Sequence, residues 1–126
     1  MHLYHNLPLS NRTAIEDVKP LSTLTNLTSL GLGYNPIKDI KPLSALTNLT
    51  WLRLSSNGIK DVEPLSVLTN LKWLRLDLNQ IEDVKPLSKL TNLTWLDLRM
   101  NPLRDRSCPI QPSICKVSPV GAYDAY

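Results

Sequence analysis

The chain has 126 residues, enough for one domain, and its formal net charge of +3 is too small to indicate nucleic-acid or acidic-membrane binding. Polar residues interrupt the leucines throughout, and the N-terminus lacks a basic start followed by an apolar stretch, so neither a transmembrane segment nor a signal peptide is evident. The default expectation is a cytoplasmic protein without membrane contact. A secreted location stays open if the chain is a fragment.

Residues 1–23 combine an irregular start with the second half of a repeat unit. The stretch Ala14–Leu24 matches the end of the repeat described below, and Leu7 and Leu9 before it alternate as in a short strand. The step from Leu9 to Ile15 is one residue longer than the regular repeat allows. We therefore expect a degenerate or truncated first coil without a dedicated cap. The open sheet edge left there favours self-association.

Residues 24–107 consist of four copies of one repeat with a period of 22 residues. The copies are 24–45, 46–67, 68–89 and 90–107. In the second copy Leu52 and Leu54 alternate as in a short strand, whereas Ile59 and Leu65 follow at steps that fit neither a strand nor a helix. The pattern predicts one coil of a solenoid, in which a strand and a return segment enclose the core.

An asparagine follows the second strand leucine by three residues in every copy. These residues are Asn35, Asn57, Asn79 and Asn101. Buried backbone groups lose their ladder partners where the chain leaves a strand, and an amide side chain can both donate to them and accept from them. The spacing therefore predicts a stack of structural asparagines that satisfies the backbone coil after coil.

The pattern L-x-x-L-x-L-x-x-N-x-I, as in Leu49–Ile59, resembles leucine-rich repeat proteins. The repeat length and the D-(I/V)-x-P-L-S ending resemble the bacterial internalin-like and phosphatase-regulator types. The resemblance covers residues 15–103 and implies an α/β solenoid, a horseshoe with a parallel sheet on its concave face. Short 3₁₀ or extended segments are implied on the convex face. It implies no particular ligand, because these scaffolds bind many unrelated partners.

The residues between the strand leucines are expected to face the concave side. Read across the coils, they form the columns Ser29, Trp51, Trp73, Trp95; Gly31, Arg53, Arg75, Asp97; Gly33, Ser55, Asp77, Arg99; and, at the strand exit, Tyr34, Ser56, Leu78, Met100. All three tryptophans of the chain share one column. Because neighbouring strands lie about 4.8 Å apart, we expect the three indoles to stack as an offset ladder.

These columns favour a non-enzymatic module that binds an unidentified protein or peptide on the concave face. Tryptophan and arginine are the side chains that most often anchor protein interfaces, and the charged residues are expected to supply orientation and specificity. The expected partner-binding residues are Trp51, Trp73, Trp95, Arg53, Arg75, Asp77, Asp97, Arg99, Tyr34, Leu78 and Met100.

Other interpretations of the tryptophan column stay open. Stacked indoles can simply stabilise a sheet, and duplication can copy a residue without selection. A flat row of indoles also suits a carbohydrate, with arginine and aspartate bonding its hydroxyls. A single-stranded nucleic acid is not expected, because the column charges are mixed and no basic groove is evident. A truncated repeat fragment without independent function is a further alternative.

The repeat fails at residues 108–116, where we expect a capping loop. Cys108 and Cys115 are candidates for a structural disulfide, and a reduced buried pair or a reactive pair are the alternatives. Two cysteines without a nearby histidine match a metal site poorly. The sequence shows no catalytic set, so neither an enzyme, nor a cofactor, nor a metal is expected. Residues 117–126 are expected to be a disordered tail.

Overall fold

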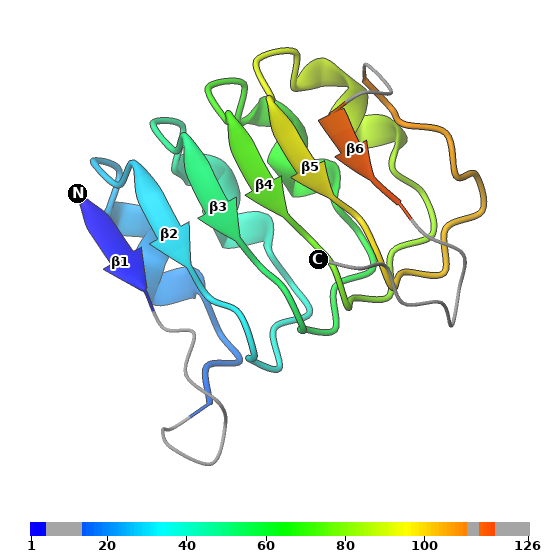
Figure 1. Cartoon of the computed structure of the whole chain (residues 1–126). Helices are drawn as coiled ribbons and strands as arrows, with labels where there is room; N and C mark the ends of the chain where they lie inside the picture. Colours follow the sequence, from blue (N-terminus) through cyan, green and yellow to red (C-terminus); the bar gives the residue numbers. More distant parts are fainter. Residues whose placement is uncertain (5–13, 111–113, 118–126) are drawn as a thin grey trace.

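The computed structural model describes residues 1–4, 14–110 and 114–117. Within these residues six short strands form one open parallel sheet whose spatial order is the order of the sequence (Figure 1). The strands are β1 (His2–Tyr4), β2 (Ser29–Gly31), β3 (Trp51–Arg53), β4 (Trp73–Arg75), β5 (Trp95–Asp97) and β6 (Cys115–Lys116). Parallel neighbours need a long connection, and the rest of each coil supplies it. The predicted parallel sheet is confirmed.

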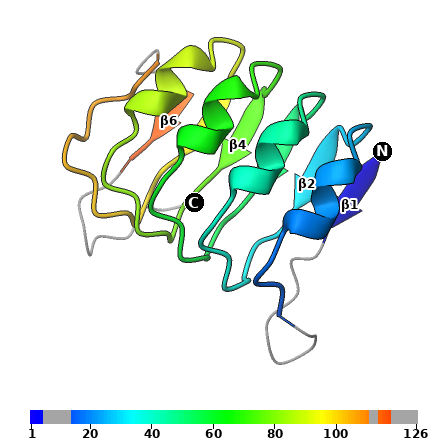
Figure 2. The same ribbon diagram turned by 180° about the vertical axis from the view of Figure 1, so that it is seen from behind.

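Short 3₁₀ helices stack behind the sheet and cover its other side (Figure 2). They are η2 (Lys19–Thr23), η3 (Lys41–Ala45), η4 (Glu63–Val67) and η5 (Lys85–Lys89). Each begins with a proline in its first turn, where the missing N–H is tolerated. An aspartate precedes each helix and accepts a backbone N–H two residues on, as Asp39 Oδ1 does from Lys41 N at 3.0 Å. The solenoid predicted from the repeat, with short 3₁₀ segments on its convex face, is confirmed.

Aliphatic side chains fill the space between the sheet and the helices. In the second copy of the repeat Leu52, Leu54, Ile59 and Leu65 all have no exposed area. The same positions in the other copies form one continuous core. Because each coil buries its apolar residues against its neighbours, this core leaves the outward strand side chains free of any role in it.

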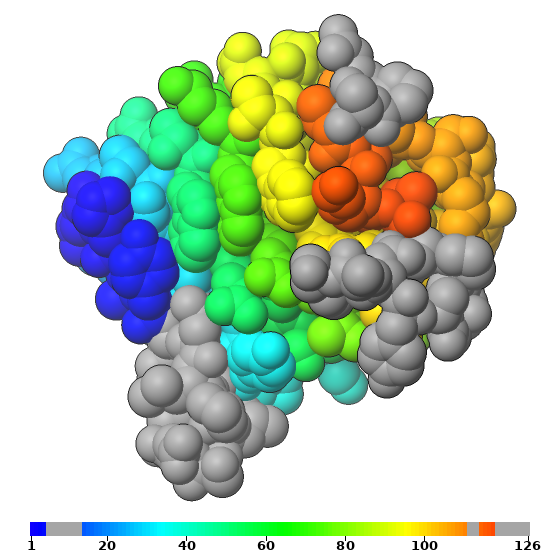
Figure 3. Space-filling view, in the orientation of Figure 1, coloured from blue at the N-terminus to red at the C-terminus, as the bar shows by residue number. Residues whose placement is uncertain are grey.

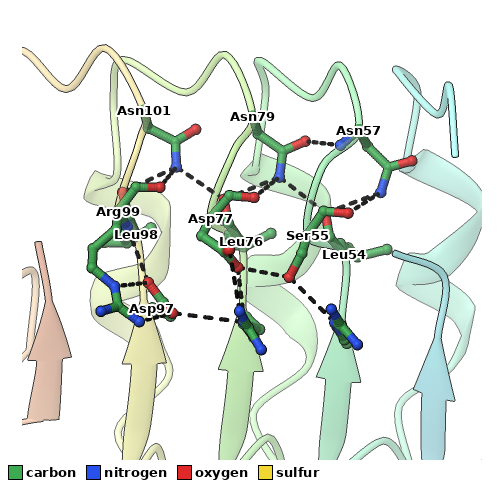
Figure 4. A network of polar contacts seen from close by, with 12 residues as sticks. Leu54, Ser55, Asn57, Leu76, Asp77, Asn79, Asp97, Leu98, Arg99 and Asn101 are labelled. Carbon is green, nitrogen blue, oxygen red and sulfur yellow. Dashed lines mark hydrogen bonds and ion pairs between the residues drawn. The ribbon is translucent and has the colours of Figure 1, made fainter. Parts of the chain in front are cut away.

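The four asparagines line the exit of the strands, where the chain turns away from the sheet, and Figure 4 shows three of them, Asn57, Asn79 and Asn101. Asn79 Nδ2 donates to the carbonyl oxygens of Leu76 at 3.0 Å and of Leu54 in the preceding coil at 2.9 Å. Its Oδ1 accepts from Ile59 N at 3.2 Å. Each asparagine thus satisfies backbone groups of two successive coils, which ties the coils together along the solenoid axis.

The first strand lies upstream of where the sequence pattern suggested it. β1 consists of His2–Tyr4, with Leu3 packed against the core, and it pairs with β2 alone as the N-terminal edge of the sheet. Leu7 and Leu9 fall in residues 5–13, outside the described part of the chain. β1 was not predicted, because its one inward leucine, Leu3, is too little to show the alternation of apolar and polar residues that marks a strand.

The capping segment is partly a strand and not only a loop. Cys108 and Cys115 are joined by a disulfide with their Cα atoms 5.7 Å apart. Cys115 lies in β6, opposite Leu96 of β5, so the segment adds a strand to the sheet. Ile110 and Ile114 pack against the core beside it. The predicted tail begins at Val117, which also packs there; residues 111–113 and 118–126 lie outside the described ranges.

Candidate functional site

The outward side chains of β1 to β6 and of the strand exits form one surface, named the strand face below (Figure 3). Side chains of β3, β4 and β5 stand on it as adjacent parallel ridges. The register places Trp51 opposite Trp73 and Trp73 opposite Trp95. The sheet therefore brings the predicted columns together on one side of the molecule.

Trp51 and Trp73 form a parallel stack at the centre of this face. Their ring centroids are 4.6 Å apart and their planes differ by 6°. This distance is close to the separation of neighbouring strands, about 4.8 Å, so the rings face each other across the gap between β3 and β4. Each indole consequently covers one face of the other and turns its edge to the surface.

Trp95 does not continue this stack, contrary to the expected ladder of three rings. Among the ring contacts of the described residues, none joins Trp73 to Trp95. Instead Lys116 Nζ lies 5.3 Å from the Trp95 ring centroid, a cation–π distance. Lys116 comes from β6, whose register next to β5 the repeat pattern could not supply. Trp95 belongs to the capped end of the face.

Two aromatic residues of β1 extend the stack in the opposite direction. Tyr4 meets Trp51 edge-on, with centroids 5.4 Å apart and an interplanar angle of 80°. His2 and Tyr4 lie parallel at 6.3 Å. Tyr4 stands opposite Gly31 of β2, which has no side chain, so the phenol ring can reach across β2 to Trp51. We call His2, Tyr4, Trp51 and Trp73 the aromatic row.

The repeat pattern does not predict the β1 part of this row. The first residues look irregular in sequence because no second copy of their pattern exists. The one available signal was the small size of Ser29 and Gly31, where the later copies have tryptophan and arginine or aspartate. Small residues on β2 leave room for large side chains from the neighbouring strand.

Most of the charged residues that were expected to contact a partner form ion pairs with one another instead. Arg75 Nε lies 3.0 Å from Asp77 Oδ1 and 3.6 Å from Asp97 Oδ2, and Arg99 Nη2 lies 2.8 Å from Asp97 Oδ2 (Figure 4). Ser55 Oγ donates to Asp77 Oδ1 at 2.6 Å. The exposed fractions of Asp77, Asp97 and Arg99 are only 1%, 0% and 4%.

Asp77, Asp97 and Arg99 are thus buried and paired within the protein, whereas the sequence led us to expect them on a partner surface. Opposite charges in adjacent columns lie within reach of one another across a parallel sheet. Buried charges must be paired to be tolerated, so they pair with each other and leave solvent. Their role in the folded chain is to hold β4 and β5 and the turns after them together.

Arg53 is different from the other two arginines of the strand face. Its Nε donates to Ser55 Oγ at 3.5 Å, a long hydrogen bond, and its guanidinium carbon lies 5.5 Å from the Tyr34 ring centroid. Within the described residues no carboxylate lies at ion-pair distance from Arg53. The side chain is half-buried beside the aromatic row.

The strand exit holds four residues in the left-handed backbone region. They are Tyr34, Ser56, Leu78 and Met100, with φ of 61°, 56°, 59° and 60°. Residues other than glycine, asparagine and aspartate rarely adopt this conformation, which costs about 1–2 kcal/mol. Tyr34 and Leu78 are moreover 40% and 42% exposed. Tyr34 and Leu78 are thus large apolar side chains that are exposed to solvent and that stand on a backbone conformation unfavourable for them.

The described residues form neither a metal-ligand cluster nor a membrane-spanning helix. Among those that the structure describes, no three His, Cys, Asp or Glu side chains gather closely enough to hold a metal ion. Nor does this part of the chain contain a helix with the length and apolar character needed to cross a membrane. The aromatic row, Arg53 and the strand exit remain the candidate site.

Comparison with known proteins gives matches to both sequence and structure. Residues 47–88 match the family of leucine-rich repeats in two copies. The crystal structure of internalin C2 from Listeria monocytogenes has a TM-score of 0.79 and 40% identity, over 84% of this chain and 48% of that protein. Internalin F from Listeria monocytogenes has a TM-score of 0.64 and 31% identity, over 76% of this chain and 35% of that protein.

A plant receptor has the same architecture. The leucine-rich repeat ectodomain of the membrane receptor kinase GASSHO1/SCHENGEN3 from Arabidopsis thaliana, solved in complex with Casparian strip integrity factor 2, has a TM-score of 0.60 and 26% identity. The alignment covers 68% of this chain and 11% of the receptor. The chain thus spans 48% or less of each of these proteins. No curated protein sequence matches it.

Proposed function

The chain is a leucine-rich repeat protein with internalin-like repeats, and we propose that it is a non-enzymatic module that binds a protein or peptide on its strand face. The receptor ectodomain with the same architecture was solved in complex with a partner factor, which supports this class of function. In the present chain the centre of the binding surface would be Trp51 and Trp73. Tyr4, Tyr34 and Leu78 extend it.

The observation that carries the proposal is the position of Tyr34 and Leu78. Glycine or asparagine would fit the left-handed backbone better, and a polar residue would suit the exposure better. The core does not use these side chains, because they are turned outward. The positive φ recurs in four coils, so the scaffold sets the backbone there, and what the core does not explain is the choice of Tyr34 and Leu78 for this position. Exposed apolar side chains on the same face as stacked indoles are what a partner surface can bury.

Stabilisation of the sheet accounts for part of the site only. The stack of Trp51 and Trp73 strengthens the pairing of β3 and β4 whether or not a partner binds. It gives no reason for an exposed Leu78 or Tyr34. A carbohydrate or a nucleic-acid base needs a free ring face for stacking. The stack uses one face of each indole and turns the edges of both rings to the surface, so the geometry favours a protein or peptide that packs against these edges.

The test is a selection of random dodecapeptides on phage against the folded protein. Peptides that bind the wild type are then measured on Trp73→Ala and on Leu78→Asn. Asparagine tolerates positive φ better than leucine, so Leu78→Asn removes apolar surface without adding backbone strain. The matched control is Val67→Ala, because Val67 is 52% exposed on η4 at the opposite side.

We expect both strand-face variants to lose the selected peptides and the control to keep them. Circular dichroism and a thermal melt establish that each variant is folded. Peptides that bind Val67→Ala poorly and both strand-face variants well would place the binding surface on the convex side and overturn the proposal. Failure to select any peptide that distinguishes the wild type from Leu78→Asn would also count against it.

A further inference from the structure

Arg53 stands out when the three arginines of the strand face are compared. Arg75 and Arg99 each have a carboxylate oxygen within 3.0 Å. The repeat explains the difference for Arg53, because the residue two positions later is Ser55, whereas Asp77 occupies that position after Arg75. Ser55 in turn donates its hydroxyl hydrogen to Asp77 at 2.6 Å. Because Ser55 is neutral, no carboxylate of the described residues compensates the charge of Arg53.

The guanidinium group of Arg53 also keeps most of its donors available. Its hydrogen bonds within the described residues amount to one from Nε at 3.5 Å. The guanidinium carbon lies 5.5 Å from the Tyr34 ring centroid, a cation–π contact that uses none of the guanidinium N–H groups as hydrogen-bond donors. A planar fork of donors fixed in this way matches a carboxylate, which can accept two parallel hydrogen bonds.

The surroundings of Arg53 favour an acidic group over a basic or neutral one. The strand face carries Arg53, Arg75 and Arg99 against Asp77 and Asp97, which leaves one positive charge before Lys116 is counted. Both aspartates are at most 1% exposed and bound to arginine, so neither presents a free negative charge beside Arg53. The excess positive charge therefore lies at Arg53.

Arg53 lies next to the apolar part of the site. Side chains two residues apart on a strand point to the same side, so Arg53 and Trp51 are neighbours along β3. The Tyr34 ring, from the exit of β2, also contacts the guanidinium. A ligand carboxylate on Arg53 would thus sit between Tyr34 and the indole stack. A side chain adjacent to that carboxylate would reach the edges of Trp51 and Trp73.

We infer that Arg53 binds a carboxylate of the partner, and that the partner segment is an acidic peptide with an apolar or aromatic residue beside the acidic one. This inference rests on the proposed function of the strand face and specifies its ligand. The carboxylate can be a side chain of Asp or Glu or the C-terminus of a peptide. The two sources present the same chemistry to the guanidinium.

The experiment uses peptides selected on the wild-type protein, synthesised in matched forms. One form replaces Asp and Glu by Asn and Gln, and another replaces the free C-terminal carboxylate by an amide. Affinities are measured for the wild type, Arg53→Gln and Arg53→Lys. Arg104→Gln is the control, because it removes the same charge from a side chain that is 75% exposed and paired with Glu82.

We expect Arg53→Gln to weaken binding about 10- to 100-fold, the range for a charge-assisted hydrogen-bonded contact, and Arg104→Gln to change it little. Arg53→Lys should recover part of the loss. The form that removes the contacted carboxylate should bind the wild type and Arg53→Gln equally weakly, which identifies the source of the carboxylate.

Two results would overturn the inference. One is a set of selected peptides without acidic residues that bind the wild type as amides. The other is equal affinity of the acidic peptides for the wild type and Arg53→Gln. If Leu78→Asn still abolishes binding in either case, the strand face remains the binding surface and only the role of Arg53 fails. If neither variant lowers the affinity, the proposed function fails with it.

Discussion

At the N-terminal end of the strand face, around β3, Arg53 has no carboxylate partner among the described residues, and the aromatic row is open to solvent at Tyr4. At the C-terminal end, around β5, Asp97 is fully buried between arginines and Trp95 lies under Lys116. Both ends are built on the same repeat and the same asparagine stack. At the end around β5 the charged side chains pair with one another, and we call it the closed end. The end around β3 keeps hydrogen-bond donors and apolar surface available, and we call it the open end. A solenoid can therefore separate stability from recognition along its axis.

Removal of the buried carboxylate at the closed end should have the largest effect. Asp97→Ala leaves Arg99, which is 4% exposed, without its 2.8 Å carboxylate. An uncompensated buried charge costs about 3–5 kcal/mol in free energy of unfolding. Urea unfolding measures this loss. Arg53→Gln is the comparison, and we expect it to stay within about 0.5 kcal/mol of the wild type. Equal losses for the two variants would contradict the division of the face into two ends.

Removal of the disulfide at the closed end should have the second largest effect on the free energy of unfolding. In the chain-entropy description a loop as short as that between Cys108 and Cys115 stabilises the fold by about 2–3 kcal/mol. The double variant Cys108→Ser, Cys115→Ser should lose about that amount in urea unfolding. Peptide binding at the open end should not change, because β6 is separated from β3 by two strands. A parallel loss of affinity would show that the two ends are coupled.

The asparagine stack should matter equally at both ends. Asn79→Leu keeps a similar volume but removes the donor to Leu76 and Leu54 and the acceptor for Ile59. Unpaired buried backbone groups should lower the free energy of unfolding by about 1–3 kcal/mol. Thermal melts of Asn79→Leu and Asn57→Leu measure this effect. Absence of any loss in both variants would refute the structural role of the stack.

The sequence was sufficient to predict those structural features that recur in every copy of the repeat. The period of the leucines predicted the coil and the sheet, and the spacing of Asn79 from Leu76 predicted where the strand-exit amide lies. It was insufficient where a residue has no counterpart in another copy. β1 offers one inward leucine, and Lys116 comes from a segment without repeat register, so the positions of Tyr4 and of the group above Trp95 could not be inferred.

The pairing of the charged side chains could not be inferred from the sequence for a different reason. The sequence placed Arg75, Asp77 and Asp97 in the correct columns of the strand face. Whether a charged side chain faces solvent or its neighbour depends on rotamers and on distances of 3.0 to 3.6 Å, which a one-dimensional pattern does not contain. The same limit applies to Arg53, which has no carboxylate at ion-pair distance in the part of the chain that the structure describes.

The smallest expected effect is that of Ser56→Gly. Compared with Leu78→Asn, it shows whether the strained backbone or the exposed side chain of the strand exit serves recognition. Ser56 has φ of 56° like Leu78 at 59°, but it presents no apolar side chain to a partner. Ser56→Gly relieves about 1 kcal/mol of backbone strain and costs about 0.5 kcal/mol in added freedom of the unfolded chain, a net gain of about 0.5 kcal/mol. Urea unfolding should detect this gain, and affinity for the selected peptides should stay unchanged. Leu78→Asn relieves strain at the equivalent position of the next coil, yet it should lose those peptides. If Ser56→Gly also lost them, the backbone of the strand exit, and not its exposed side chains, would be the recognition element.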